Sequence, residues 1–209
     1  MTACRAQDYL RQQEERSRTS RQRILDAAVR CLVELGYAGA STLRIQEYAG
    51  ISRGRLLHHF PSRDELLVGA VQHLAAARVE ELRANVRATI TADDAAPGRI
   101  DEAIEQMWTA FHQPFFWASV ELWVAARHNE SLREALLPAE RQLQNAIRDT
   151  LAVMFGPVWS AHPRYRHTVE ILLGCMRGTA LTYSFDPHDA ARDPQVAAWQ
   201  EMARAMLGG

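Results

Sequence analysis

Apolar side chains recur at spacings of three and four along most of the chain, which is the period of an α-helix with one buried face. The clearest example is the stretch of residues 20–35, whose apolar stripe consists of Ile24, Ala27, Ala28, Cys31, Leu32 and Leu35. The 209 residues contain no strand-like alternation of useful length. The pattern therefore predicts an all-α protein.

Capping residues, glycines and prolines divide this pattern into separate helices. We expect helices at about residues 20–35, 42–49, 52–59, 63–89, 99–112, 114–128, 131–155, 162–184 and 194–207. Gly36 should end the first helix, and Gly156 should end the seventh. Ser131 and Glu134 have the spacing of a capping box and should start that seventh helix.

Other stretches are expected to interrupt or leave the helical pattern. The first dozen or so residues are polar and mixed in charge, which is typical of a mobile arm. Residues 91–98 form a loop by composition, and residues 186–189 separate the last two helices. Pro138 should kink or restart the helix in which it lies.

Residues 41–63 predict two short helices joined by a tight turn. Thr42 can cap the first helix, because its hydroxyl can accept an orphan backbone N–H. Gly50 stands where the chain must leave that helix, and Ser52 can cap the second. The second helix carries the donors Arg53, Arg55, His58 and His59. A helix–turn–helix whose second helix presents such donors is a DNA-reading unit.

Positive charge gathers in this part of the chain, although the formal net charge of the whole chain is −1. Residues 1–65 hold 11 arginines against 8 acidic residues, whereas residues 66–209 hold 13 arginines against 17 acidic residues. A basic end on an otherwise mildly acidic chain favours nucleic acid as its partner.

Composition excludes several classes of protein. Hydrophobic residues make up 47% of the chain and charged residues 23%, which is ordinary for a globular protein. No apolar run approaches the roughly 20 residues that span a bilayer, and the N-terminus lacks the apolar core of a secretory signal. The 3 cysteines are too few and too scattered for a disulfide framework or a metal knuckle. We expect a cytoplasmic protein with no membrane partner.

Several short motifs within residues 20–67 agree in order and spacing. They read Arg23-Ile24-Leu25-Asp26-Ala27-Ala28, Leu35-Gly36-Tyr37, Thr42, Ala49-Gly50-Ile51-Ser52-Arg53-Gly54, and His58-His59-Phe60-Pro61-Ser62-Arg63-Asp64-Glu65-Leu66. In these motifs the chain closely resembles the N-terminal DNA-binding domain of the TetR family of bacterial transcriptional repressors. The resemblance implies a DNA-binding domain in residues 1–65 and a helical ligand-binding and dimerisation domain in residues 66–209.

The docking of a recognition helix in the major groove assigns the expected DNA contacts. Arg53 and Arg55 lie near its N-terminal end, where side chains meet base edges. Phosphate contacts are expected from Thr42, Arg44 and Ser52. His58 and His59 can touch the DNA backbone, or one of them can be a packed structural histidine.

Three positions are interpreted by comparison with the family pattern. Arg63 matches a family position that commonly reaches a phosphate. Gln46 stands where the family usually has Ala, and Leu57 stands where it usually has Tyr. Leu57 cannot donate a hydrogen bond to a phosphate, but it can pack on a thymine methyl group or a sugar.

Aromatic side chains crowd residues 107–128, and two adjacent faces of the predicted helices there are apolar. Such a stripe is a plain core, or it lines an apolar cavity with a few polar anchors. The resemblance favours a pocket for a small hydrophobic or aromatic effector. Its expected lining residues are Trp108, Phe111, His112, Phe115, Phe116, Glu121, Trp123 and Phe155.

The last two helices can pair across a two-fold axis to form a four-helix bundle in a homodimer. Gly174 and Gly178, four residues apart, would let a neighbouring helix approach closely. The expected interface consists of Ile171, Gly174, Cys175, Gly178, Leu181, Trp199 and Met202. A dimer also suits palindromic operator DNA, because each recognition helix reads one half-site.

Enzymatic function has little support in the sequence. We find no phosphate-binding loop, nucleophile elbow or metal-ligand spacing, and we expect no catalytic residues, metal or cofactor. The sequence therefore favours a ligand-responsive transcriptional repressor. The alternative is an all-helical protein that binds a small molecule without specific DNA activity.

Overall fold

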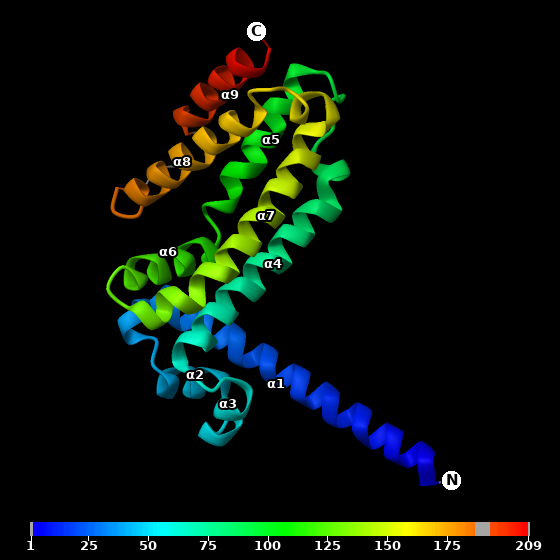
Figure 1. Ribbon diagram of the computed structural model, residues 1–209, viewed down its shortest axis with the longest axis vertical. Coiled ribbons are helices and arrows are strands. Elements are labelled where there is room, and N and C mark those ends of the chain that lie inside the picture. Colours follow the sequence, from blue (N-terminus) through cyan, green and yellow to red (C-terminus); the bar gives the residue numbers. More distant parts are fainter. Residues whose placement is uncertain (1, 187–192, 209) are drawn as a thin grey trace. The chain divides into compact units, whose positions relative to one another are not determined.

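The structure, a computed structural model, describes residues 2–186 and 193–208, with side chains from residue 18 onward. It confirms the all-α prediction, because the described residues contain helices and no strand (Figure 1). The helices are α1 (Thr2–Gly39), α2 (Thr42–Ala49), α3 (Arg53–His59), α4 (Arg63–Thr89), α5 (Pro97–Ala110), α6 (Pro114–Ala126), α7 (Glu130–Ser160), α8 (Tyr165–Tyr183) and α9 (Pro194–Leu207).

Most predicted boundaries agree with these helices, and two glycines break them as expected. Gly36 has φ 67° and Gly156 has φ 78°, a left-handed region that side chains other than glycine rarely adopt. The expected arm is wrong, because α1 begins at Thr2. Its first 18 residues contain no glycine or proline, and most are fair helix formers.

Three smaller expectations also change. Gly156 is the residue of α7 with non-helical dihedral angles, so Pro138 does not restart the helix. The N-cap of α7 is Asn129 instead of Ser131, because the Asn129 Oδ1 atom accepts the Leu132 N–H at 3.1 Å. The expected break at residues 186–189 falls largely outside the described residues.

The chain divides into two compact units. Unit 1 comprises the chain up to Ala75 together with Trp117–Arg141, and unit 2 comprises Ala76–Phe116 and Gln142–Gly209. Unit 1 therefore contains the whole predicted DNA-binding domain and adds residues 66–75 and 117–141. The recognition helix shares a core with the second half of α6 and the start of α7.

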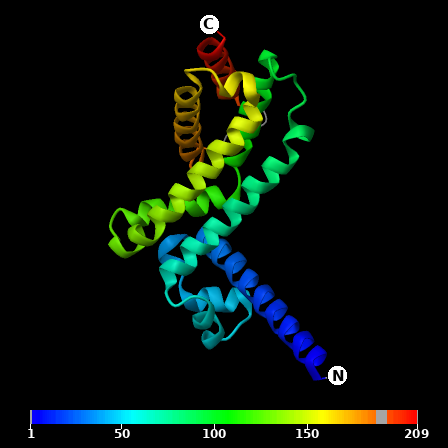
Figure 2. The ribbon, with the colours of Figure 1, turned by 45° about the vertical axis from the view of Figure 1, so that its right-hand side comes forward.

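Unit 1 is built around α1, with α2 packed against α1 and α3 packed against α2 (Figure 2). The apolar stripe predicted for residues 20–35 is buried there, except that Leu35 is exposed. The fully buried side chains of the unit 1 core include Ile24, Leu25, Leu32, Ile45, Leu56, Leu66, Leu67, Leu122 and Leu132.

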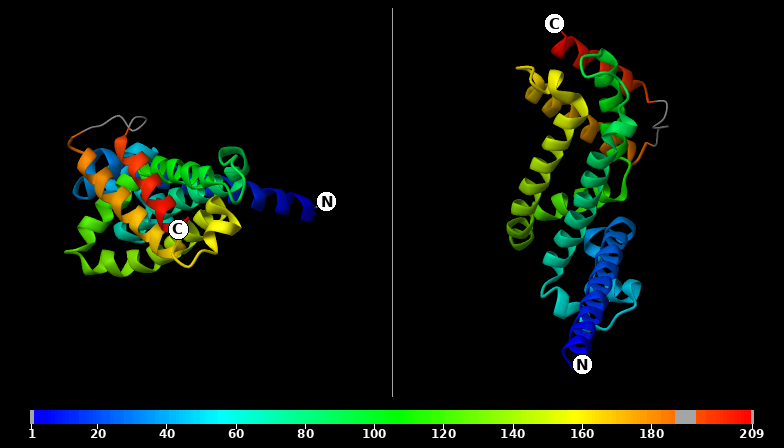
Figure 3. Two further views of the ribbon diagram at one scale, coloured as in Figure 1. Left: turned by 90° about the horizontal axis from the view of Figure 1, so that it is seen from above. Right: turned by 90° about the vertical axis from the view of Figure 1, so that its right-hand side faces the viewer.

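In unit 2, α9 lies beside α8 and against α5 (Figures 1 and 3). The inner faces of these helices and of the second half of α7 supply a second core, which includes Ile100, Ile104, Phe155, Leu172, Met176 and Leu207. None of the described helices combines the length and apolar character that a membrane crossing requires.

Candidate nucleic-acid interface and aromatic cluster

The turn between α2 and α3 is fixed by two caps and one glycine. Ser41, instead of the expected Thr42, caps α2, because its extended backbone lets its Oγ atom accept the Arg44 N–H at 3.3 Å. Gly50 ends α2 with φ 61°. Ser52 caps α3 as predicted, and its Oγ atom accepts the Arg55 N–H at 3.4 Å.

Arg23 of α1 forms a hydrogen bond to the end of α2 and so supports this turn, a contact that the sequence pattern did not predict. Its guanidinium donates to the Ala49 carbonyl at 2.7 Å. The carbonyl belongs to the last turn of α2, where intrahelical partners run out. The brace therefore satisfies a helix end and fixes the place from which α3 departs.

The outer face of α3 presents the predicted DNA contacts to solvent. Leu56 and Phe60 are buried, whereas Arg53, Arg55 and His58 are exposed. Within the described side chains neither Arg53 nor Arg55 forms an ion pair. Both guanidinium groups therefore keep their donors for an external acceptor.

Leu57 also lies on this outer face and is 45% exposed, so its side chain adds little to the core. His59 is half-buried beside His58, with 5.4 Å between ring centroids. Burial lowers the pKa of His59, and the positive charges of His58, Arg55 and Arg21 lower it further. His59 is thus a neutral, partly packed histidine, whereas His58 faces outward.

The expected phosphate contacts differ in their surroundings. Arg44 is exposed and pairs with Glu47 at 3.2 Å across one turn of α2, while Thr42 is half-buried at the helix start. An exposed ion pair of this kind is weak, so Arg44 can exchange Glu47 for a phosphate at small cost.

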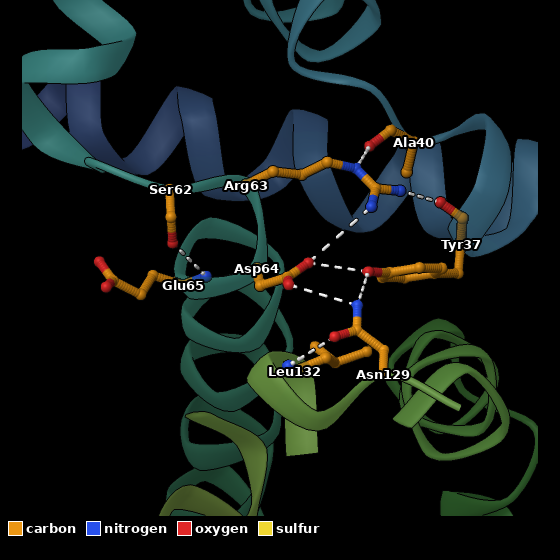
Figure 4. A network of polar contacts seen from close by, with 8 residues as sticks. All are labelled: Tyr37, Ala40, Ser62, Arg63, Asp64, Glu65, Asn129 and Leu132. Carbon is orange, nitrogen blue, oxygen red and sulfur yellow. Dashed lines mark hydrogen bonds and ion pairs between the residues drawn. The ribbon is translucent and has the colours of Figure 1, made fainter. Parts of the chain in front are cut away.

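Arg63 is engaged inside unit 1 instead of pointing to solvent (Figure 4). Its Nε atom donates to the Ala40 carbonyl at 2.8 Å, and a terminal nitrogen donates to the Tyr37 carbonyl. Its guanidinium also lies 4.2 Å from the centroid of the Tyr37 ring. These contacts engage two of the five guanidinium donors and give Arg63 a structural role within unit 1, while its expected phosphate contact stays a prediction.

A ring of polar contacts lies beside Arg63 at the start of α4 (Figure 4). The Tyr37 hydroxyl donates to Asp64 Oδ1 at 2.8 Å, and Asn129 Nδ2 donates to the Tyr37 hydroxyl at 2.9 Å. Sequence reasoning missed this group because its members are up to 92 residues apart and no local pattern links them.

Trp108 is the centre of an aromatic cluster in unit 2. Its ring meets those of His112 at a centroid distance of 4.6 Å, Trp199 at 4.9 Å and Phe111 at 5.9 Å. Phe111 in turn meets Phe116 at 5.0 Å. The structure therefore brings together the four predicted pocket residues Trp108, Phe111, His112 and Phe116.

The other predicted pocket residues lie elsewhere. Phe155 is fully buried and meets Tyr165, with 5.4 Å between centroids, while Phe115 is half-buried. Trp123 packs against the core of unit 1. The Glu121 carboxylate accepts the Tyr37 backbone N–H at 2.8 Å, so it supports unit 1 instead of anchoring a ligand.

Two buried polar atoms near the Trp108 cluster lack a hydrogen-bond partner in the described part of the chain: Trp108 Nε1 and Asp193 Oδ2. Trp108 is 3% exposed and Asp193 is 7% exposed. Tyr183 connects the two residues, because its ring contacts Trp108 and its hydroxyl donates to Asp193 Oδ1 at 3.2 Å. An unpartnered donor and an unpartnered acceptor thus border the same cluster.

The predicted dimer residues separate into an outer and an inner set. Gly174, Cys175, Gly178 and Leu181 are exposed along one side of α8, which we name the α8 outer face, and Ile171 at its edge is half-buried. Trp199 belongs to the inner set, because it is 5% exposed and packs on Trp108. Met202 is half-buried. In the described residues no three His, Cys, Asp or Glu side chains gather as a metal site requires.

Comparison with known proteins agrees with this architecture. The chain is 34% identical over 126 residues to the transcriptional regulator CymR of Pseudomonas putida, a match covering 60% of each protein. It is 31% identical over 132 residues to the transcriptional repressor AcnR of Corynebacterium diphtheriae, with 63% of each covered. The matches thus span less than two thirds of the length of these relatives.

A solved structure and a family model extend the comparison. The multidrug binding protein EbrR complexed with ethidium shares the fold, with a TM-score of 0.61, 24% identity, and coverage of 90% of this chain and 97% of EbrR. Residues 24–70, which hold α2, α3 and most of the unit 1 core, match the model described as bacterial regulatory proteins of the tetR family. In this N-terminal part the chain is similar to the tetR family of bacterial regulatory proteins, to which the matched model belongs.

Proposed function

We propose that this protein is a ligand-responsive transcriptional regulator that binds operator DNA and represses transcription until an effector releases it. The observation that carries the proposal is the outer face of α3, where Arg53 and Arg55 are exposed at the capped end of the helix and form no ion pair with the described side chains. A bidentate arginine contact to guanine discriminates against other bases by about 1–3 kcal/mol. A cytoplasmic location follows, because the operator is chromosomal DNA.

The proposed assembly is a homodimer that pairs through the α8 outer face. The exposed glycines Gly174 and Gly178 have open space where a side chain would stand, so a second helix can approach the backbone closely. Leu181 supplies apolar area at the end of this face and is 39% exposed. Two recognition helices in a dimer would read half-sites about one helical turn, or a multiple of it, apart.

The proposed effector is a hydrophobic or aromatic small molecule that inserts at the Trp108 cluster. Trp108 Nε1 can donate a hydrogen bond and Asp193 Oδ2 can accept one, so hydroxyl or amide groups on an aromatic body are the partners that suit these atoms. The ethidium complex of EbrR supports an aromatic guest for this fold. A coupling free energy of about 1–3 kcal/mol between effector and operator would weaken DNA binding roughly 5- to 150-fold.

Selection of duplexes from a random pool by the full-length protein tests the DNA-binding part. We expect enrichment of a palindromic site, an affinity that falls steeply with salt, and loss of sequence preference in Arg53→Ala. An absence of binding to any duplex at low salt would favour the alternative, an all-helical protein that binds a small molecule without specific DNA activity.

Tryptophan fluorescence tests the effector part. A panel should compare aromatic hydrocarbons with aromatic alcohols and amides of the same size. Saturable quenching by the hydroxyl or amide compounds, together with release of the selected duplex, is the expected result. If every compound leaves the fluorescence unchanged, the aromatic cluster is a plain core.

A further inference from the structure

Asn129 makes contacts from both ends of its side-chain amide (Figure 4). Its Oδ1 atom accepts the Leu132 N–H and so caps α7. Its Nδ2 atom donates to the Tyr37 hydroxyl at 2.9 Å and to Asp64 Oδ2 at 3.5 Å. One side chain at the α6–α7 turn thus connects the residue that follows the Gly36 break in α1 with the first turn of α4, all within unit 1.

The donors and acceptors of this ring are matched. The Tyr37 hydroxyl has one proton, which it gives to Asp64, and its oxygen accepts from the Asn129 amide. The pKa of Tyr37 is raised, first by burial and then by its hydrogen bond to the Asp64 carboxylate. The hydroxyl therefore keeps its proton at physiological pH, and its hydrogen bonds to Asp64 and Asn129 persist.

Glu121 of α6 holds the same tyrosine by its backbone. Its carboxylate accepts the Tyr37 N–H at 2.8 Å. A Cβ atom at Gly36 would come within 3.0 Å of Glu121 Oε2, and the φ of Gly36 is positive. Glycine at this position therefore lets the carboxylate reach the backbone. Tyr37 is fixed at its main chain by α6 and at its side chain by the cap of α7.

The contacts continue from Tyr37 toward the recognition helix. Arg63 of α4 donates to the Tyr37 and Ala40 carbonyls, and the next residue, Ser41, caps α2. Arg63 lies three residues after Phe60, whose ring is buried at the end of α3. Arg63 therefore joins the two ends of the segment that contains α2 and α3, next to the ring of polar contacts.

We propose that Asn129 is a positioning residue for operator recognition, which sets the orientation of α3 through Tyr37, Asp64 and Arg63. The inference rests on the proposed DNA-binding function and extends it to a residue outside the helix–turn–helix. The physical reason is that polar networks with discrete arrangements can carry coupling between distant sites. A displacement of the α6–α7 turn would break the ring and release α2 and α3 from their fixed position.

The test compares Asn129→Ala with Asn145→Ala in the full-length protein. Asn145 is an exposed asparagine of α7 whose side chain contacts Arg148, so it controls for the loss of an amide on the same helix. Hydrogen–deuterium exchange of the free proteins gives the first readout. We expect faster exchange in peptides covering residues 36–62 of Asn129→Ala, no change in peptides of α8, and no change at either place in Asn145→Ala.

Affinity for the selected duplex gives the second readout. We expect Asn129→Ala to bind it about 3- to 30-fold more weakly, the range of networks of this kind, while affinity for random duplex stays unchanged. Non-specific binding depends on total charge, which the substitution leaves intact. Tyr37→Phe, which removes only the hydroxyl, should show the same pattern more weakly if Asn129→Ala does not fold.

Asn129→Asp adds a pH-dependent measurement, because a simple loss of packing would not make the affinity for the duplex depend on pH. It places a second carboxylate beside Asp64, with Tyr37, Arg63 and Glu121 as the other titratable groups around the ring. Relative to wild type at each pH, its affinity for the duplex should be lowest near pH 8 and recover toward pH 5, where a shared proton restores a donor.

The outcomes are separable. Unchanged exchange in residues 36–62 of Asn129→Ala overturns the inference whether or not the protein binds DNA. Faster exchange there supports the inference even if the wild-type protein selects no duplex, which would refute the proposed function alone. Wild-type affinity of Asn129→Ala for the selected duplex, or a pH-independent ratio for Asn129→Asp, also overturns it.

Discussion

Replacing Arg63 by alanine should destabilise unit 1 instead of removing a phosphate contact. The substitution deletes two hydrogen bonds from a charged donor, to the Ala40 and Tyr37 carbonyls, and a cation–π contact with the Tyr37 ring. The arginine side chain is only 28% exposed, so water replaces these contacts incompletely.

The expected loss follows from these contacts. A hydrogen bond with a charged partner contributes about 1.5–3 kcal/mol, and a partly exposed cation–π contact contributes about 0.5–1 kcal/mol. Taking the lower value of each range for two hydrogen bonds and one cation–π contact, Arg63→Ala should lower the free energy of unfolding by about 3.5 kcal/mol. Urea denaturation followed by circular dichroism measures that free energy.

Salt dependence of duplex binding separates the two roles. Each phosphate contact adds about 0.9 to the slope of log affinity against log salt, so loss of a phosphate contact should lower the slope by about that amount. We expect an unchanged slope for folded Arg63→Ala. The control Arg44→Ala should lose slope but keep its stability within about 0.5 kcal/mol, because Arg44 is exposed. Stability close to wild type together with a reduced slope for Arg63→Ala would refute the structural role.

Three further predictions concern the turn after α2, the half-buried His59 and the aromatic cluster around Trp108. Gly50→Ala should lower the free energy of unfolding by about 1–2 kcal/mol, because φ is 61° at Gly50. The control Gly54→Ala should not destabilise the protein, because Gly54 is helical and has open space where a Cβ atom would stand. Thermal melts that rank the two variants the other way would contradict this prediction. Folding lowers the pKa of His59 and so favours its neutral form, which means that its contribution to stability should be fully present above about pH 6.5 and be lost as the pH falls through the lowered pKa. Thermal melts of His59→Gln should therefore show a smaller loss of stability at acid pH than melts of the wild type. Trp108→Phe removes a donor that has no partner in the described residues, so the free energy of unfolding should stay close to that of the wild type. The affinity for an aromatic alcohol that the wild type binds, measured by calorimetry, should fall about fivefold. Equal affinities would exclude the indole N–H as a contact.

The sequence by itself determined the local structure. Helical periodicity located the helices, and the left-handed glycines marked the end of α2 at Gly50 and the breaks at Gly36 and Gly156. The cap at Ser52 and the charge of the recognition helix were also readable, because each depends on residues within one or two turns. The errors at Thr42 and Ser131 were shifts of one or two residues between neighbouring polar side chains that can all cap a helix.

Only the tertiary structure decided which side chains meet across the chain. Arg63, Glu121 and Trp199 each carry a residue type that suits the role expected from sequence, yet their neighbours in space engage them elsewhere. The contact between Asn129 and Tyr37 spans 92 residues, and no periodicity records such a pairing. Local pattern specifies which face of a helix is buried, whereas the partner of a polar group depends on how those faces pack together.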